Sequence, residues 1–136
     1  MKRLLAIDYG TKRCGIAVTD ILQISVNPLS VVHPAELLSF LEAYIAKEPV
    51  ELLIIGEPIR TDGSQGKIEP EIVGFIRKFQ KQFPLIPIER QNEQGTSKMA
   101  VQTMIATGVK KKARAQKSAV DKVSAVLILQ TYLGRI

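Results

Sequence analysis

The first strand pattern of the chain ends in an aspartate, and this combination restricts the folds that the chain can adopt. The apolar run Leu4–Ile7 is typical of a strand buried on both faces, with Asp8 still in its interior. The segment Arg13–Thr19 alternates as a second strand, and the short connection with Gly10 at its turn predicts a hairpin. An ionised carboxylate in a buried strand costs several kcal/mol unless a partner compensates it. Asp8 therefore indicates either a nearby basic partner or a chemical role.

Further strand and helix patterns follow in a regular order. The runs Leu29–Val32, Glu51–Gly56 and Leu85–Gln91 predict three more strands. Helices are predicted over Ala35–Lys47, Glu69–Phe83, Thr96–Thr107 and Ser118–Leu133. Three antiparallel strands and then alternating helices and parallel strands make a mixed five-stranded sheet with helices on both faces. This order is that of the ribonuclease H-like fold, an α/β fold.

Length and composition indicate an ordinary globular protein. The 136 residues are enough for one domain over residues 1–136, and 46% of them are hydrophobic and 24% charged. Cys14 is the one cysteine and alternates with the apolar residues of its strand, so we expect it in the core. His33 precedes a proline between elements and is expected to be structural. No apolar run has the length of a membrane span or signal peptide, which predicts a cytoplasmic protein without a membrane partner.

The charge of +6 is concentrated in one segment. Gln94–Val120 contains no acidic residue, and five of the eight residues in Lys110–Lys117 are basic. Such a segment is either a solvated loop or a surface that contacts phosphates. Few aromatic residues are present, so a nucleic acid would be held mainly by its backbone. The candidate nucleic-acid-binding residues are Lys12, Arg13, Arg60, Lys110, Lys111, Lys112, Arg114 and Lys117.

Three acidic residues are predicted to meet at one edge of the sheet. Asp8 belongs to the first strand, and either Glu89 or Glu93 would come from the fifth, where Glu93 stands between strand and helix. Asp121 shares a helix face with apolar residues, although Ser118 three positions before it also forms a capping-box pattern. Carboxylates around two divalent metal ions are the chemistry of phosphodiester cleavage, and Mg²⁺ prefers such oxygen ligands. Glu57, at the end of the fourth strand, is a weaker fourth candidate.

Three segments carry a resemblance to a known family. AIDYGTKRCGIAVTD, GEPIRTDGSQG and VDKVSAVLILQTYL resemble motifs of the YqgF (RuvX) family, whose members are described as Holliday junction resolvases and as pre-16S ribosomal RNA nucleases. The resemblance runs nearly end to end. It implies a ribonuclease H-like nuclease that uses Mg²⁺ or Mn²⁺ at Asp8, Glu93 and Asp121. It also implies a nucleic-acid partner, either precursor ribosomal RNA or branched DNA, and a monomer or weak homodimer.

One motif departs from the family pattern. The family typically has Asp-Glu-Arg and an apolar residue where this chain has Asn92, Glu93, Gln94 and Gly95. This change predicts a weak nuclease and leaves open a non-catalytic RNA-binding factor for ribosome assembly. A further alternative is nucleotide phosphotransfer, because DYGTKRCG is also similar to the phosphate loop of the actin and sugar-kinase fold. That fold needs a second lobe, which 136 residues cannot supply.

Overall fold

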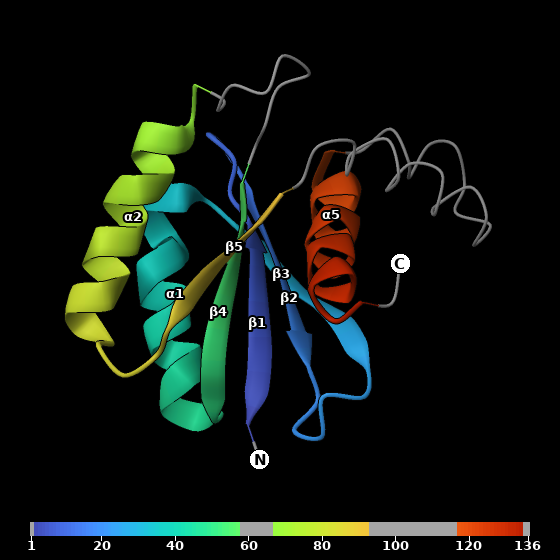
Figure 1. Cartoon of the computed structure of the whole chain (residues 1–136). Coiled ribbons are helices and arrows are strands. Elements are labelled where there is room, and N and C mark those ends of the chain that lie inside the picture. Colours follow the sequence, from blue (N-terminus) through green and yellow to red (C-terminus); the bar gives the residue numbers. More distant parts are fainter. Residues whose placement is uncertain (1, 58–66, 93–116, 135–136) are drawn as a thin grey trace.

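A five-stranded sheet forms the centre of the protein (Figure 1). The structure is a computed structural model that describes residues 2–57, 67–92 and 117–134. The strand order is β3-β2-β1-β4-β5, with β1–β2 and β2–β3 antiparallel and β4 and β5 parallel to β1. The strands are β1 (Arg3–Asp8), β2 (Cys14–Thr19), β3 (Val26–Val32), β4 (Val50–Glu57) and β5 (Ile88–Asn92). The mixed sheet expected from the sequence is therefore confirmed.

Helices cover both faces of the sheet, which the sequence also predicts. The helices are α1 (Pro34–Lys47), α2 (Glu69–Gln82) and α5 (Lys117–Tyr132). Figure 1 shows α1 and α2 on one face and α5 on the other. Successive residues of β1 alternate between the two layers, since Leu5 and Ile7 pack under α1 and α2 while Leu4 and Ala6 pack under α5. All four of these β1 side chains are buried.

The boundaries of two strands differ from the prediction. β3 starts at Val26, three residues earlier than expected. It can include Pro28 because it is an edge strand and its pairing with β2 is irregular at this point. β5 starts at Ile88 and not at Leu85, which is 94% exposed and lies in a turn. Pro87 precedes the strand and has no backbone N–H to donate. The predicted helix over 96–107 lies outside the described residues.

Two minor expectations are confirmed. Cys14 is fully buried in the core under α1 and α2. His33 is structural, because its Nδ1 accepts a hydrogen bond of 3.0 Å from the backbone N–H of Ala35 and so caps α1. Among the described helices, none is long and apolar enough to cross a membrane.

Candidate active site

The parallel strands end together at one edge of the sheet, which we call the carboxyl edge. β1 ends at Asp8, β4 at Glu57 and β5 at Asn92, with Glu57 opposite Asn92 in the strand register. Figure 1 shows these strand ends at the top of the molecule, where α5 also begins. Residues at the carboxyl ends of neighbouring parallel strands lie close together, so this edge is the natural place for a shared site. Glu93, the next residue after β5, lies outside the described residues.

The sequence suggested that Asp8 lies in the interior of a strand, but the structure places it at the end of one. It is the last residue of β1 and is half-buried, because the strand ends at the surface one residue after Ile7. Alternation along β1 puts Asp8 on the face that α5 covers, since Leu4 and Ala6 pack there. The carboxylate therefore belongs to the α5 side of the carboxyl edge.

Glycines flank Asp8 on both neighbouring strands. Gly15 of β2 lies directly opposite Asp8 in the antiparallel register. On the other side Ile7 pairs with Ile55, so the next position of β4, level with Asp8, is Gly56. Because neither glycine has a side chain, the α5 side of the sheet carries no side chain from β2 or β4 at the level of Asp8. The two strand neighbours therefore place no side chain beside the carboxylate of Asp8.

α5 runs so that Asp121 lies toward the carboxyl edge. The stripe Ala125, Ile128 and Leu129 packs on the sheet against Ala6 and its neighbours, as the sequence predicts. Asp121 lies one helical turn, about 6 Å, before Ala125, and Asp8 lies about 6–7 Å beyond Ala6 along β1. α5 runs opposite to β1, because its last residues lie near the start of that strand (Figure 1). The backbone of Asp121 is thus near the carboxyl edge, while its side chain is outside the described part of the structure.

The capping-box alternative for Asp121 is wrong. Lys117 is already helical, so Ser118 lies inside α5 and cannot be its N-cap residue. Asp121 stays a predicted ligand at the carboxyl edge.

The two alternative carboxylates, Glu57 and Glu89, lie on opposite faces of the sheet. Side chains of β4 alternate between the two faces of the sheet, and Leu53 and Ile55 pack on the α1–α2 face. Glu57 is two positions after Ile55, so it lies on that face and not on the face of Asp8. Glu89 lies three residues before the end of β5 and accepts a hydrogen bond from the Tyr132 hydroxyl, near the end of α5. Burial, and then this contact with Glu89, raises the pKa of Tyr132. Glu57 is therefore separated from Asp8 by the sheet, whereas Glu89 shares the α5 face with Asp8 but lies level with Ile54, two positions before the level of Asp8.

The loop between β1 and β2 brings basic residues to the carboxyl edge. Gly10 is required there because a Cβ at this position would lie 2.4 Å from the carbonyl oxygen of Arg13. Lys12 is exposed in this loop and Arg13 is half-buried. Five other predicted contacts lie outside the described residues, namely Arg60, Lys110, Lys111, Lys112 and Arg114. Lys117 is described only as the first residue of α5.

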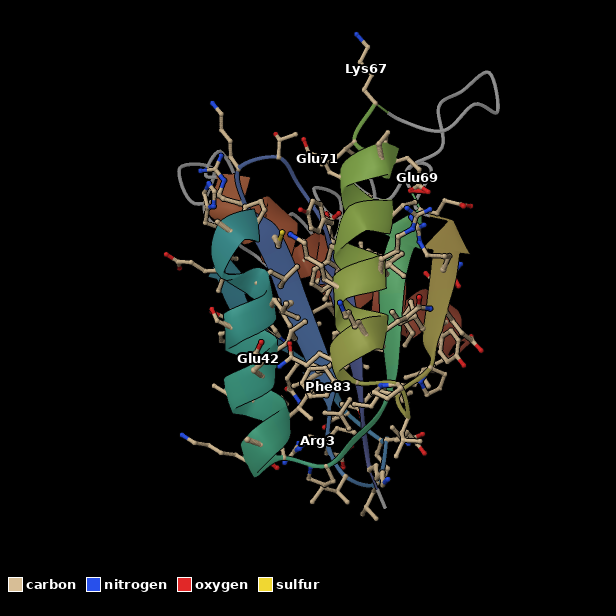
Figure 2. The ribbon with its side chains drawn as sticks, turned by 90° about the vertical axis from the view of Figure 1, so that its left-hand side faces the viewer. Arg3, Glu42, Lys67, Glu69, Glu71 and Phe83 are labelled. Carbon is tan, nitrogen blue, oxygen red and sulfur yellow. The ribbon has the colours of Figure 1, made fainter. Side chains whose placement is uncertain are left out.

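An arginine clamp that sequence reasoning missed holds the ends of β4 and β5. Arg90 makes two hydrogen bonds to Glu69, Nη2–Oε1 at 2.7 Å and Nη1–Oε2 at 3.0 Å. The same guanidinium donates to the carbonyl oxygens of Ile55 at 3.3 Å and Gly56 at 3.1 Å. Figure 2 shows Glu69 on the side of α2 that faces β5. The two residues are 21 positions apart, so no local pattern could have paired them.

No group of three metal-ligating side chains (His, Cys, Asp, Glu) occurs within residues 2–57, 67–92 and the part of α5 whose side chains are described. Asp8 is the one member of the predicted triad whose side chain the structure describes. Its carboxylate fits a hard divalent cation by chemistry, and the strand position opposite to it is a glycine, which has no side chain.

Solved structures with a similar fold are Holliday junction resolvases. RuvC of T. thermophilus in complex with Holliday junction substrate superimposes with a TM-score of 0.57 at 16% identity, over 98% of this chain and 97% of that chain. The fowlpox virus Holliday junction resolvase gives a TM-score of 0.57 at 13% identity, over 98% and 99%. These likenesses confirm the ribonuclease H-like class of fold.

Sequence comparisons identify the family. The RuvX family, described as Holliday junction resolvase, matches residues 2–135. A protein of Christiangramia forsetii named "Putative pre-16S rRNA nuclease" is 50% identical over 98% of both chains. A protein of the same name from Bacteroides thetaiotaomicron is 48% identical over 98% of this chain and 96% of its own. This chain belongs to the RuvX family and is a nuclease by class, as its motifs predict.

Proposed function

We propose that this protein hydrolyses phosphodiester bonds at the 5′ end of precursor 16S ribosomal RNA, in the cytoplasm, with the help of Mg²⁺ or Mn²⁺. The observation that carries the proposal is the half-buried Asp8 on the α5 side of the carboxyl edge, between Gly15 and Gly56. The names of the relatives that are about 50% identical support the RNA substrate.

Asp8, Glu93 and Asp121 are the residues that would hold the metal. When bound, a divalent ion would activate a water molecule and stabilise the charge of the leaving oxygen. The chain itself supplies a carboxylate at a strand end, and the two strand positions level with it carry no side chain. Lys12 and Arg13, in the loop beside Asp8, would contact neighbouring phosphates of the bound strand.

The test is cleavage of two substrates by the purified protein, with Mg²⁺, with Mn²⁺ and with EDTA. One substrate is an RNA that spans the mature 5′ end of 16S ribosomal RNA, and the other is a four-way DNA junction. We expect metal-dependent cleavage of the RNA. We expect Asp8→Asn and Asp121→Asn to reduce cleavage to background without lowering the melting temperature, because each change relieves repulsion among carboxylates.

Glu36→Gln is the matched control, since Glu36 is an exposed carboxylate outside the proposed site and should leave cleavage unchanged. An Asp8→Asn or Asp121→Asn variant that cleaves at the rate of the unmodified protein would remove that residue from the proposed metal site.

The description of the family favours junction DNA as a second candidate substrate. A resolvase needs two coordinated cuts and hence a dimer, whereas an RNA-processing nuclease can act as a monomer. Paired cuts in the junction by a dimeric species would therefore favour the resolvase. Binding of RNA without cleavage of either substrate would favour an RNA-binding assembly factor.

A further inference from the structure

A groove of about 360 Å³ lies between α1 and α2, on the sheet face opposite to Asp8. Figure 2 shows the two helices side by side, with Glu71 on the side of α2 that faces α1. The volume lies within the range of sites for small molecules. We call this feature the α1–α2 groove; the lining residues that matter here are Tyr9, Leu38, Glu71, Gly74, Phe75 and Lys78.

Gly74 keeps the floor of this groove open. It lies inside α2, where glycine destabilises a helix relative to alanine. Its backbone has no positive φ, and a Cβ added to it would meet no atom within 4 Å. Neither backbone conformation nor packing therefore requires a glycine at this position. Its effect is to leave room for a flat group against the helix.

The walls of the groove suit a planar aromatic ligand with a polar edge. The rings of Tyr9 and Phe75 lie 5.9 Å apart between centroids and tilt by 40°. Leu38 supplies an aliphatic surface from α1. Exposed Glu71 and Lys78 lie on either side of Gly74 along α2, one as a hydrogen-bond acceptor and one as a donor. A nucleobase has this combination of a flat apolar face and a hydrogen-bonding edge.

The groove is continuous with the carboxyl edge. Tyr9 directly follows Asp8 in the chain and packs on the α1–α2 side, while Asp8 lies on the α5 side. A nucleic-acid strand that crosses the edge with one phosphate near Asp8 would bring an adjacent base to Tyr9. We propose that the α1–α2 groove binds one unpaired nucleobase next to the scissile phosphate. This inference rests on the proposed nuclease function.

The test compares binding of two single-stranded RNAs of eight nucleotides in EDTA, by fluorescence anisotropy. One carries its bases and the other is abasic at every position with the same phosphates. The unmodified protein should bind the base-bearing RNA at least about fivefold more tightly, the lower end of what stacking one base contributes. Gly74→Leu, which fills the groove, should lose this preference without a change in the Kd for the abasic strand.

Gln80→Leu is the control, because it adds the same side chain at an exposed position of α2 away from the groove and should retain the preference. If Gly74→Leu does not fold, Gly74→Ala should weaken the preference in part. Equal binding of both RNAs by the unmodified protein, or a full preference in folded Gly74→Leu, would overturn the groove proposal alone. Failure to bind either RNA would overturn the proposed function as well.

Discussion

Asn92 and Gln94 stand where the RuvX motif typically has an aspartate and an arginine. Asparagine has the shape of aspartate without its charge, and glutamine lacks the planar charged group with which arginine binds a phosphate at two points. A lost charge-assisted contact costs about 1.5–3 kcal/mol, or roughly ten- to a hundredfold in rate if it acts in the transition state. We therefore expect slow cleavage by this protein, and at least about tenfold faster Mg²⁺-dependent cleavage by Asn92→Asp with Gln94→Arg. Fast cleavage by the unmodified protein and no gain in the double variant would mean that the motif was aligned wrongly.

Asp20 organises the turn between β2 and β3. Its Oδ1 accepts hydrogen bonds from the backbone N–H groups of Ser25 at 3.0 Å and Ile24 at 2.6 Å. The hydrogen bond from Ser25 is the largest of the effects that hold the pKa of Asp20 below its ordinary value of 3.8. A lowered pKa in the folded state means that the stabilisation is present above the ordinary pKa and is lost as the pH falls through the lowered one.

Asp20→Ala should therefore lower the melting temperature at pH 7, and the difference should shrink as the pH falls below about 4. Asp20→Asn is the matched control, because its amide oxygen still accepts both hydrogen bonds but does not titrate in this range. Thermal unfolding at pH 7 and pH 3 measures both effects. A difference between Asp20→Ala and the unmodified protein that stays constant over this range would contradict the prediction.

At the scale of elements, the Arg90–Glu69 pair joins α2 to the ends of β4 and β5. Glu69 is 7% exposed, and its carboxylate receives both hydrogen bonds from a guanidinium that also binds two β4 carbonyls. Glu69→Gln removes the charge from a buried bidentate contact. We expect a loss of about 1.5–3 kcal/mol in the free energy of unfolding, measured in urea.

The pair Arg3–Glu48 provides the control for this prediction. Its Nε–Oε2 distance is 3.1 Å, but the side chains are 22% and 36% exposed, so Glu48→Gln should cost less than about 1 kcal/mol. Equal losses in Glu69→Gln and Glu48→Gln would show that the Arg90 clamp contributes no more than a surface ion pair.

At the scale of the whole molecule, the charge of +6 is concentrated in sequence around Lys110–Lys117, which we expect to contact phosphates. Replacing Lys110, Lys111 and Lys112 with glutamine should weaken the binding of RNA and DNA to a similar degree, whatever their sequence. The slope of log K against log salt should fall by about 2 for single strands if each lysine contacts one phosphate. Anisotropy titrations at several salt concentrations measure this slope.

The control is a second triple variant, in which Lys2, Lys47 and Lys81 are replaced with glutamine. It changes the net charge by the same amount. These exposed lysines lie at the start of β1 and in the last turns of α1 and α2, at the end of the sheet opposite to the carboxyl edge. If both triple variants change the slope equally, binding follows net charge alone and the segment Lys110–Lys112 has no special role.

The order of strands and helices, and the two-layer covering of the sheet, could be read from the sequence. Apolar residues repeat with the period of each element, and that period depends on local burial alone. Two features could be predicted in this way, because each depends on residues close together in the chain. They are the tight turn at Gly10 and the apolar stripe of Ala125, Ile128 and Leu129 on α5. Asp8 was also identified as unusual from its local context.

The tertiary structure decided which residues share a face and which strands are neighbours. It separated Glu57 from Asp8 by the sheet, engaged Glu89 with Tyr132, and aligned Gly15 and Gly56 with Asp8. It also paired Arg90 with Glu69 and opened the α1–α2 groove beside Tyr9. These relations depend on the register between strands and on helix packing. Both are set by contacts between residues far apart in the chain, which a local pattern of polar and apolar residues does not encode.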